Sequence, residues 1–263
     1  MRKKLNKKKL MKLSIASSLL VFTCSALFIF TKEDYEAETI YVNDEILILN
    51  IEESNDIKEE EKTSFLVDID KIKNIENLMI VAHPDDETFW AGDFISKEKS
   101  LVLCITNGGN DVRKKEFLDV MKETNNYGII LEYPDNPNQI KDNWSEVKDS
   151  IYNDLHYLVS LKSWNKVITH NPEGEYGHLQ HKFTSMMVTN ICVEVKQIDN
   201  LYYFEKYMTR EKVKEEKVLL TEKEVKEKSR LMQMYTSQSY SYQTFKHMIG
   251  YERLIAYNDW YFD

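Results

Sequence analysis

The chain has 263 residues, of which 42% are hydrophobic and 12% aromatic, enough for one globular domain with a buried core plus additional chain at one end. Seven basic and no acidic residues lie among the first 30, which leaves 28 basic against 44 acidic residues in the remainder, a balance of −16. A body this acidic repels phosphate backbones, so the composition argues against a nucleic-acid partner.

The first element along the chain is a predicted membrane segment. A basic tail, residues 1–12, precedes the uncharged run 13–30, which is long enough to cross a bilayer. The positive-inside rule keeps the basic tail in the cytoplasm and exports everything after Phe30. We therefore expect a single-pass signal anchor in the cell membrane and an extracytoplasmic folded domain. Cleavage of a signal peptide, giving a secreted protein, and lipidation at Cys24 are the alternatives.

An acidic stalk or linker is predicted for residues 31–73. Residues 32–62 contain twelve acidic residues against three lysines, and such a composition buries too little apolar surface to fold alone. The apolar island 40–51 is compatible with a strand. The folded domain is expected over residues 74–263.

Short apolar runs then alternate with longer amphipathic ones, which is typical of βαβ units on a parallel sheet. The expected strands are 77–82, 101–106, 128–132, 166–169 and 201–204. One helix is expected to begin near residues 85–87. Three more are expected over about 112–127, 144–161 and 178–194, followed by a charged helical tail. Ligands of such sheets bind at the carboxyl ends of the strands, where His83, Asn107 and His170 fall.

The turn after the first strand carries an imidazole and two adjacent carboxylates, His83, Asp85 and Asp86. Catalytic zinc takes three ligands from His and Asp or Glu and keeps one position for water. Two ligands can come from this turn, and the remaining carboxylate can take a proton from the water. The alternative is that the acids only cap the helix and that Pro84 shapes its entry.

A second polar cluster occupies residues 171–181. His178 and His181 are spaced to lie on one face of a helical turn, so one can bind a metal while the other faces a substrate. Tyr176 is suited either to donate a hydrogen bond to an oxyanion or to pack. Exposed or capping histidines are the alternative, although Pro172 and two glycines indicate a shaped loop.

These motifs resemble those of the LmbE-like, or PIG-L, N-acetylglucosamine deacetylases. The family's AHPDDE motif stands here as residues 82–87 and its Gly-His-x-x-His element as residues 177–181. Further matches to its T-x-G loop, R-x-x-E helix start and Y-x-S-Q stretch stand at residues 106–109, Arg113 with Glu116, and residues 235–238. The resemblance implies a Rossmann-like, three-layer α/β/α fold with a mostly parallel sheet.

The resemblance also implies a ligand set and a base. Zinc, or another divalent metal, would be held by His83, Asp86 and His181, with Asp85 as general base. His178 would stabilise the tetrahedral intermediate and help to protonate the leaving amine.

Less central roles follow from the same resemblance. Tyr176 would assist at the oxyanion, Arg113 would hold sugar hydroxyls, and Asn107 is assigned to the same substrate-binding group. An exposed helix arginine is the alternative for Arg113. Gln180 stands where many members carry Asp, so a hydrogen bond that tunes His181 is expected to differ.

Together these features predict a zinc-dependent hydrolase that removes acetyl groups from N-acetylated sugars of a surface polysaccharide or glycoconjugate. Amide hydrolysis needs an activated water, a polarised carbonyl and a proton for nitrogen, which zinc and these residues supply. A zinc amidase of the same fold acting on a non-sugar amide, and a non-catalytic metal- or glycan-binding module, are the alternatives. The oligomeric state stays open.

Other features have structural interpretations. Cys104 and Cys192 lack paired spacing and are expected to be buried free thiols. The charge runs 210–217 and 222–230 are expected to be solvated helix faces. The aromatic residues between Tyr240 and Phe262 are expected to pack a C-terminal helix onto the sheet, with a sugar-stacking wall as the alternative.

Overall fold

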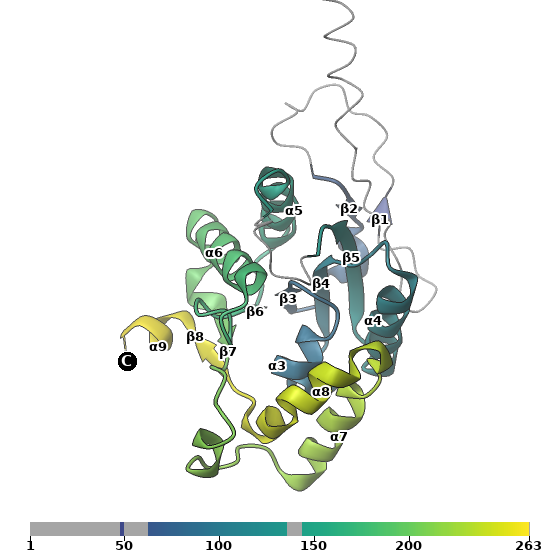
Figure 1. Ribbon diagram of the computed structural model, residues 1–263. Helices are drawn as coiled ribbons and strands as arrows, with labels where there is room; N and C mark the ends of the chain where they lie inside the picture. The colour runs from purple at the N-terminus through teal and green to yellow at the C-terminus, as the bar shows by residue number, and fades with distance from the viewer. Residues whose placement is uncertain (1–47, 50–62, 136–143, 263) are drawn as a thin grey trace, which may run out of the picture. The chain divides into compact units, whose positions relative to one another are not determined.

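The computed structural model describes residues 48–49, 63–135 and 144–262 (Figure 1). The basic tail, the run 13–30 and most of the predicted stalk lie outside the described residues, so the anchor, its alternatives and the cellular location stay predictions. Within the described ranges, no helix is long and apolar enough to cross a membrane.

Six strands form one sheet in the order β5-β4-β3-β6-β7-β8. The strands are β3 (Asn77–Val81), β4 (Ser100–Thr106), β5 (Tyr127–Tyr133), β6 (Lys166–Thr169), β7 (Leu201–Phe204) and β8 (Leu254–Ala256). All neighbours pair in parallel except β8, which pairs antiparallel with β7. The five strands predicted from the sequence are confirmed to within one residue at each end.

Helices cover both faces of this sheet (Figure 1). The larger ones are α3 (Asp86–Lys97), α4 (Asp111–Glu123), α5 (Lys148–Ser160), α6 (Leu179–Glu194) and α7 (Glu222–Met232). Alternate strand residues serve two cores: Ile80 packs in the core that includes Leu155 of α5, and Val81 in the core that includes Phe117 of α4. The three-layer α/β fold with a mostly parallel sheet is therefore confirmed.

Smaller elements complete the described chain. They are β1 (Ile48–Leu49), which pairs with β2 (Leu66–Val67), then α2 (Ile69–Ile72), α8 (Ser239–Phe245) and α9 (Tyr257–Phe262). Short 3-10 turns cover Ile198–Asn200, Lys212–Lys214, Thr236–Gln238 and Lys246–Tyr251. Phe65 and Ile72 are buried in the core shared with the sheet, so the packed body begins before residue 74.

Four helical expectations differ from the structure for local reasons. Helix α4 ends at Glu123 rather than at 127, because strand β5 already begins at Tyr127. Helix α5 begins at Lys148 rather than 144, because Trp144 has a left-handed φ of 59° and anchors a turn by donating from Nε1 to the Pro134 carbonyl. The charge run 210–217 forms only one 3-10 turn. In the second run Lys228 is buried and paired with Glu252, so that face is not wholly solvated.

The strand order also places the functional residues. From β3 the chain proceeds to β4 and β5 on one side, whereas β6 and β7 lie on the other. Ligands of open α/β sheets bind where the strand order reverses in this way, outside the carboxyl ends of the strands. Here that position lies between the ends of β3 and β6, which are followed directly by Ala82–His83 and by His170.

Candidate metal and catalytic site

The three predicted metal ligands converge from two segments, and a small triangle is formed by one ring nitrogen of each histidine and the carboxylate group of Asp86. His83 Nδ1 lies 3.2 Å from Asp86 Oδ2 and 3.2 Å from His181 Nε2, and His181 Nε2 lies 3.3 Å from Asp86 Oδ1. Zinc bonds of about 2.0–2.1 Å in tetrahedral geometry separate ligand atoms by about 3.3–3.4 Å. The donor set and its spacing therefore fit a zinc ion.

A buried carboxylate orients His181. Glu175 accepts a hydrogen bond from His181 Nδ1 at 2.6 Å, which leaves His181 Nε2 with its lone pair toward the triangle. Such partners fix the tautomer and ring orientation of metal-binding histidines. Glu175 has a left-handed φ of 52° and follows Gly174, where a Cβ atom would lie 2.6 Å from the His178 carbonyl oxygen. The two glycines of this loop are thus needed for its shape, as the sequence indicated.

Two other groups of possible ligands share residues with this triangle: His83 with His178 and His181, and Asp86 with His170 and His181. His170 is fully buried, and its Nε2 accepts the backbone N–H of Ala82 at 3.0 Å while its Nδ1 faces Glu175 at 3.0 Å. Both ring nitrogens therefore have partners that a metal would have to displace. The ring of His170 instead stacks on that of His181, with centroids 3.9 Å apart, and so helps to hold the His181 ring in place.

The outer nitrogen of His83 has two acceptors that were not expected from the sequence. His83 Nε2 lies 2.8 Å from Gln180 Oε1 and 3.4 Å from Asp135 Oδ1. The amide of Gln180 is oriented because its Nε2 donates to the Pro134 carbonyl at 2.9 Å. The expectation that Gln180 affects His181 was wrong: His181 is held by Glu175, and Gln180 acts on His83.

Carboxylates dominate the electrostatics of the triangle. Although burial opposes the shift, Asp135 and Asp86 raise the pKa of His83 to about 10. Burial likewise opposes ionisation of Asp86, but His181 and His170 hold the pKa of that carboxyl well below its usual range. A site in which carboxylates stabilise positive charge on a ring nitrogen also attracts a cation.

Asp85, the predicted base, is held in an unusual backbone conformation beside the triangle. Its φ of 116° lies in the left-handed region, a conformation that non-glycine residues adopt at a cost. The Glu87 carboxylate accepts the Asp85 N–H at 3.1 Å, and Thr88 Oγ1 donates to the Asp85 carbonyl at 2.8 Å. Burial raises the pKa of the Asp85 carboxyl well above its usual value, and Arg113 opposes this shift.

The family-like motifs far apart in the sequence are joined around this base. Tyr235 donates its phenol hydrogen to Glu87, whose other oxygen holds the Asp85 N–H. Glu116 accepts hydrogen bonds from the Ser237 N–H at 2.7 Å and the Ser237 hydroxyl at 2.6 Å. The Y-x-S-Q and R-x-x-E matches therefore serve to position the segment that carries Asp85.

The two predicted substrate-binding residues face the site but already have protein partners. Arg113 Nη2 donates to the Pro84 carbonyl and lies 3.5 Å from Asp85 Oδ2. Asn107 Nδ2 donates to Thr106 Oγ1 at 2.8 Å and to Asp135 Oδ2 at 3.1 Å. Their binding of sugar hydroxyls stays a prediction, and the contacts give both of them a role in orienting site carboxylates.

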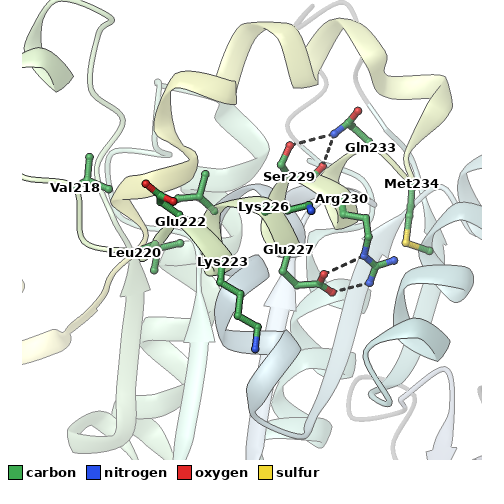
Figure 2. A pocket seen from close by; sticks show the side chains of 11 residues that line it. Val218, Leu220, Glu222, Lys223, Lys226, Glu227, Ser229, Arg230, Gln233 and Met234 are labelled. Carbon is green, nitrogen blue, oxygen red and sulfur yellow. Dashed lines mark hydrogen bonds and ion pairs between the residues drawn. The ribbon is translucent and has the colours of Figure 1, made fainter.

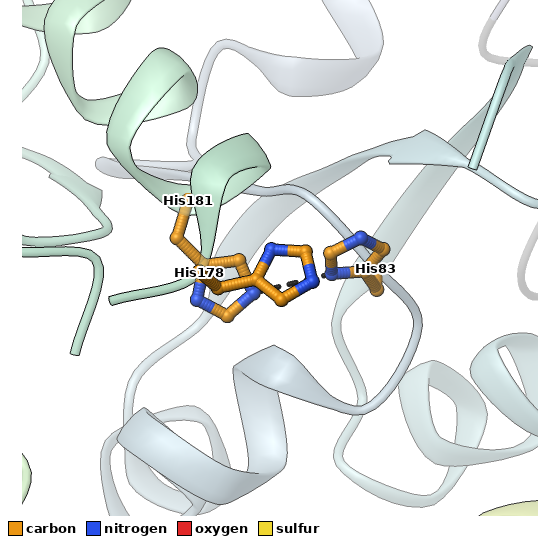
Figure 3. A group of neighbouring side chains, drawn as sticks. All are labelled: His83, His178 and His181. Atoms are coloured by element: carbon orange, nitrogen blue, oxygen red, sulfur yellow. Dashed lines mark hydrogen bonds between the residues drawn. The ribbon is translucent and has the colours of Figure 1, made fainter. Parts of the chain in front are cut away.

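His178 and Tyr176 lie at the open side of the triangle. The ring of His178 lies 4.5 Å from that of His181 and 4.8 Å from that of His83 between centroids (Figure 3). Burial, followed by the neighbouring His181 and His83, lowers the pKa of His178 to about 3, so the ring is neutral. Tyr176 is 42% exposed, and burial of its phenol, followed by the Asp86 and Asp85 charges, raises its pKa above the usual value.

A hollow of about 920 Å³ runs along α7 and contains none of these residues (Figure 2). Part of its polar lining is internally paired, since Arg230 donates to Glu227 and Gln233 donates to Ser229. The thiols Cys104 and Cys192 are buried and free, as expected.

Comparison with known proteins agrees with the site. Residues 78–192 match the family model described as PIG-L, GlcNAc-PI de-N-acetylase. This segment is similar to the PIG-L family. It contains both histidine motifs, the candidate base and the loop that carries Glu175.

Two individual proteins match the chain only in part. A protein of Acanthamoeba polyphaga mimivirus named uncharacterized protein L374 is 34% identical over 146 residues, which are 49% of this chain and 61% of that protein. The chain thus spans less than two thirds of that relative. The N,N'-diacetylchitobiose deacetylase of Pyrococcus horikoshii, solved with an inhibitor, superposes with a TM-score of 0.49 at 13% identity, covering 68% of this chain and 77% of that one.

Proposed function

We propose that this chain is a zinc-dependent deacetylase that removes acetyl groups from N-acetylated sugars of a surface polysaccharide or glycoconjugate. The observation that carries the proposal is the triangle of His83, Asp86 and His181 with Asp85 beside it, inside the segment that matches the PIG-L family model. Figure 3 shows the two histidines of the triangle. Asp85 stands at the N-cap of α3, but its side chain makes no capping hydrogen bond there, and a helix cap does not explain the convergence of both histidines on Asp86.

The donor set suits zinc, which when bound supplies a water that is nucleophilic near neutral pH and a Lewis acid for the substrate carbonyl. The protein supplies the proton chemistry. Asp85 takes a proton from the attacking water, a role favoured by burial, which raises the pKa of its carboxyl. Arg113, 3.5 Å from Asp85 Oδ2, orients that carboxylate and limits the rise.

The remaining steps fall to neutral hydrogen-bond donors. His178 is neutral, and its buried Nδ1 has no hydrogen-bond partner among the described residues. It is therefore free to bond to the developing oxyanion or the leaving nitrogen. The Tyr176 phenol, protonated because of its raised pKa, is a second donor at the same opening. Protonated Asp85 returns the proton to the leaving amine.

Place of action is the second part of the proposal. The uncharged run 13–30 behind a basic tail supports a single membrane anchor with the catalytic domain outside the cytoplasm. A surface glycan is the N-acetylated substrate that such a location offers. Protease treatment of intact cells should digest the domain, whereas protection of the domain in intact cells would contradict this location.

Asp85→Asn tests the catalytic claim. The variant should keep one zinc ion per chain, measured by elemental analysis, and lose about 10²- to 10⁴-fold in acetate release from N-acetylhexosamine oligomers. His83→Ala should lose zinc as well as activity. Asp111→Asn, on the exposed start of α4, is the matched control and should behave as wild type.

The substrate class is tested with the same protein. Acetate release from N-acetylhexosamine oligomers, and none from a panel of non-sugar acetamides, supports the proposal. Release only from the non-sugar amides would make the protein an amidase of another class. Full activity of the Asp85→Asn variant would refute the assignment of the base.

A further inference from the structure

Three aromatic side chains form a continuous surface beside the metal centre, which we call the aromatic wall: Tyr176, Tyr207 and Phe245. The ring centroid of Tyr176 lies 5.0 Å from that of Phe245 and 6.5 Å from that of Tyr207, and Tyr207 lies 6.1 Å from Phe245. The three come from the loop before α6, the segment after β7 and the end of α8. Because β6 and β7 are neighbours, the wall extends the carboxyl edge of the sheet away from β3.

The wall begins at the catalytic centre and leads away from it. Tyr176 is in ring contact with His178 at 5.9 Å and with His181 at 5.6 Å. Among the ring contacts of the described residues, Tyr207 and Phe245 touch Tyr176 but none of the histidines at the metal triangle. Tyr176 therefore lies between the histidines of the site and the two outer rings, Tyr207 and Phe245.

The composition of this surface differs from that of an ordinary core. Tyr176 is 42% exposed, and Tyr207 and Phe245 are partly exposed. Two buried ring nitrogens at its border, Trp90 Nε1 and His247 Nδ1, have no hydrogen-bond partner among the described residues. The Trp90 ring stacks on Tyr176 and meets Phe245 edge-on, and His247 meets Tyr207 edge-on.

Aromatic faces beside unpaired polar atoms fit a ligand that has both apolar faces and hydroxyl groups. A pyranose ring has this chemistry, because its C–H face packs on an aromatic ring while its hydroxyls bond at the edges. An acyl chain matches the aromatic faces but offers no hydroxyl group to polar atoms beside them.

We propose that the aromatic wall is a binding subsite for the sugar unit linked to the one that is deacetylated, so that the substrate is an oligosaccharide or polysaccharide rather than a single N-acetylated sugar. The inference rests on the proposed function, since it takes the metal triangle as the place where the acetyl group reacts. It adds a minimum substrate length of two sugar units and names the residues that bind the second unit.

Binding of the deacetylated product isolates this subsite from catalysis. Full-length zinc-loaded protein is titrated by calorimetry with glucosamine and with its β-linked disaccharide, neither of which carries an acetyl group. The disaccharide should bind about tenfold more tightly, because stacking removes further apolar surface from water. Phe245→Ala and Tyr207→Ala should each abolish most of this gain, whereas Phe245→Tyr, which retains the ring, should keep it.

Tyr240→Ala is the matched control, because Tyr240 lies on the same helix and is 83% exposed. This variant should keep the tenfold difference, and melting temperatures confirm that every variant is folded. Equal affinity for the two sugars in the wild type would overturn the proposal, as would an undiminished gain in folded Phe245→Ala. An octyl glucosaminide that bound as tightly as the disaccharide, with the same dependence on Phe245, would overturn it in favour of a lipid-linked substrate.

The two proposals fail in different ways. Tight disaccharide binding that depends on Phe245, without acetate release from any N-acetylated sugar, would refute the deacetylase and leave the sugar subsite standing. Acetate release with the same kcat/KM from a monosaccharide and from a disaccharide would refute the subsite and leave the deacetylase standing.

Discussion

Replacing Gln180 by Leu should weaken zinc binding through His83, a residue that Gln180 contacts at 2.8 Å. The Gln180 amide is fixed by its bond to the Pro134 carbonyl, so its oxygen must accept from His83 Nε2–H, which leaves Nδ1 as the metal-binding nitrogen. Loss of such a partner typically costs 10- to 100-fold in metal affinity. Asp135, 3.4 Å from the same nitrogen, remains as a weaker acceptor, so a loss of about tenfold, or about 1.4 kcal/mol, is expected.

The effect on folding should be small by comparison. The Pro134 carbonyl keeps the indole N–H of Trp144 at 2.7 Å, so this carbonyl retains a donor in Gln180→Leu, which should lower the free energy of unfolding of the metal-free protein by only about 1 kcal/mol. The double variant that also carries Asp135→Ala lacks both acceptors of His83 Nε2, so its loss of zinc affinity should reach about 100-fold.

Competition with a chromophoric chelator measures the zinc dissociation constant directly. Gln197→Leu is the matched control, because Gln197 is also buried and bonds to three backbone groups, at Trp164, Val159 and Lys162, away from the metal triangle. It should lower stability and leave zinc affinity unchanged. An unchanged dissociation constant in both Gln180→Leu and the double variant would refute the reasoning that these acceptors select the nitrogen.

Three further predictions concern other parts of the structure. Zinc at 100 times its dissociation constant should stabilise the folded chain by about 2.7 kcal/mol and raise its melting temperature by about 5–10 °C; scanning calorimetry should show no rise in His83→Ala, and a rise there would place the ion elsewhere. Tyr235→Phe frees Glu87 and with it the Asp85 N–H, so kcat should fall about tenfold with zinc content intact; an unchanged kcat would contradict that role. Lys228→Met leaves buried Glu252 without its cation and should cost about 3–5 kcal/mol in urea unfolding, whereas exposed Lys226→Met should cost almost nothing.

The local sequence predicted the strands correctly wherever a short-range pattern of apolar residues decides the structure. The apolar runs of β3 to β7 are each buried by helices on both sides, so the strands follow from their own composition. The structure of the C-terminal segment after β7 was less predictable from the sequence. The strand β8 (Leu254–Ala256) is only half-buried, and it exists because β7 offers it an edge. Lys228 likewise enters the core only because Glu252, 24 residues later, meets it there.

The two motifs placed the candidate ligands in the sequence, and the resemblance to the PIG-L family implied the set His83, Asp86 and His181. Which nitrogen each histidine offers was decided by tertiary contacts: Glu175 for His181, and Gln180 with Asp135 for His83. Asp135 lies 52 residues from His83, and no sequence pattern links them. Sequence determined the residue types and the strand ends at which they stand. Only the packing of β3 against β4 and β6 brought those ends together, because hydrogen-bond partners at a site are set by distance in space and not along the chain.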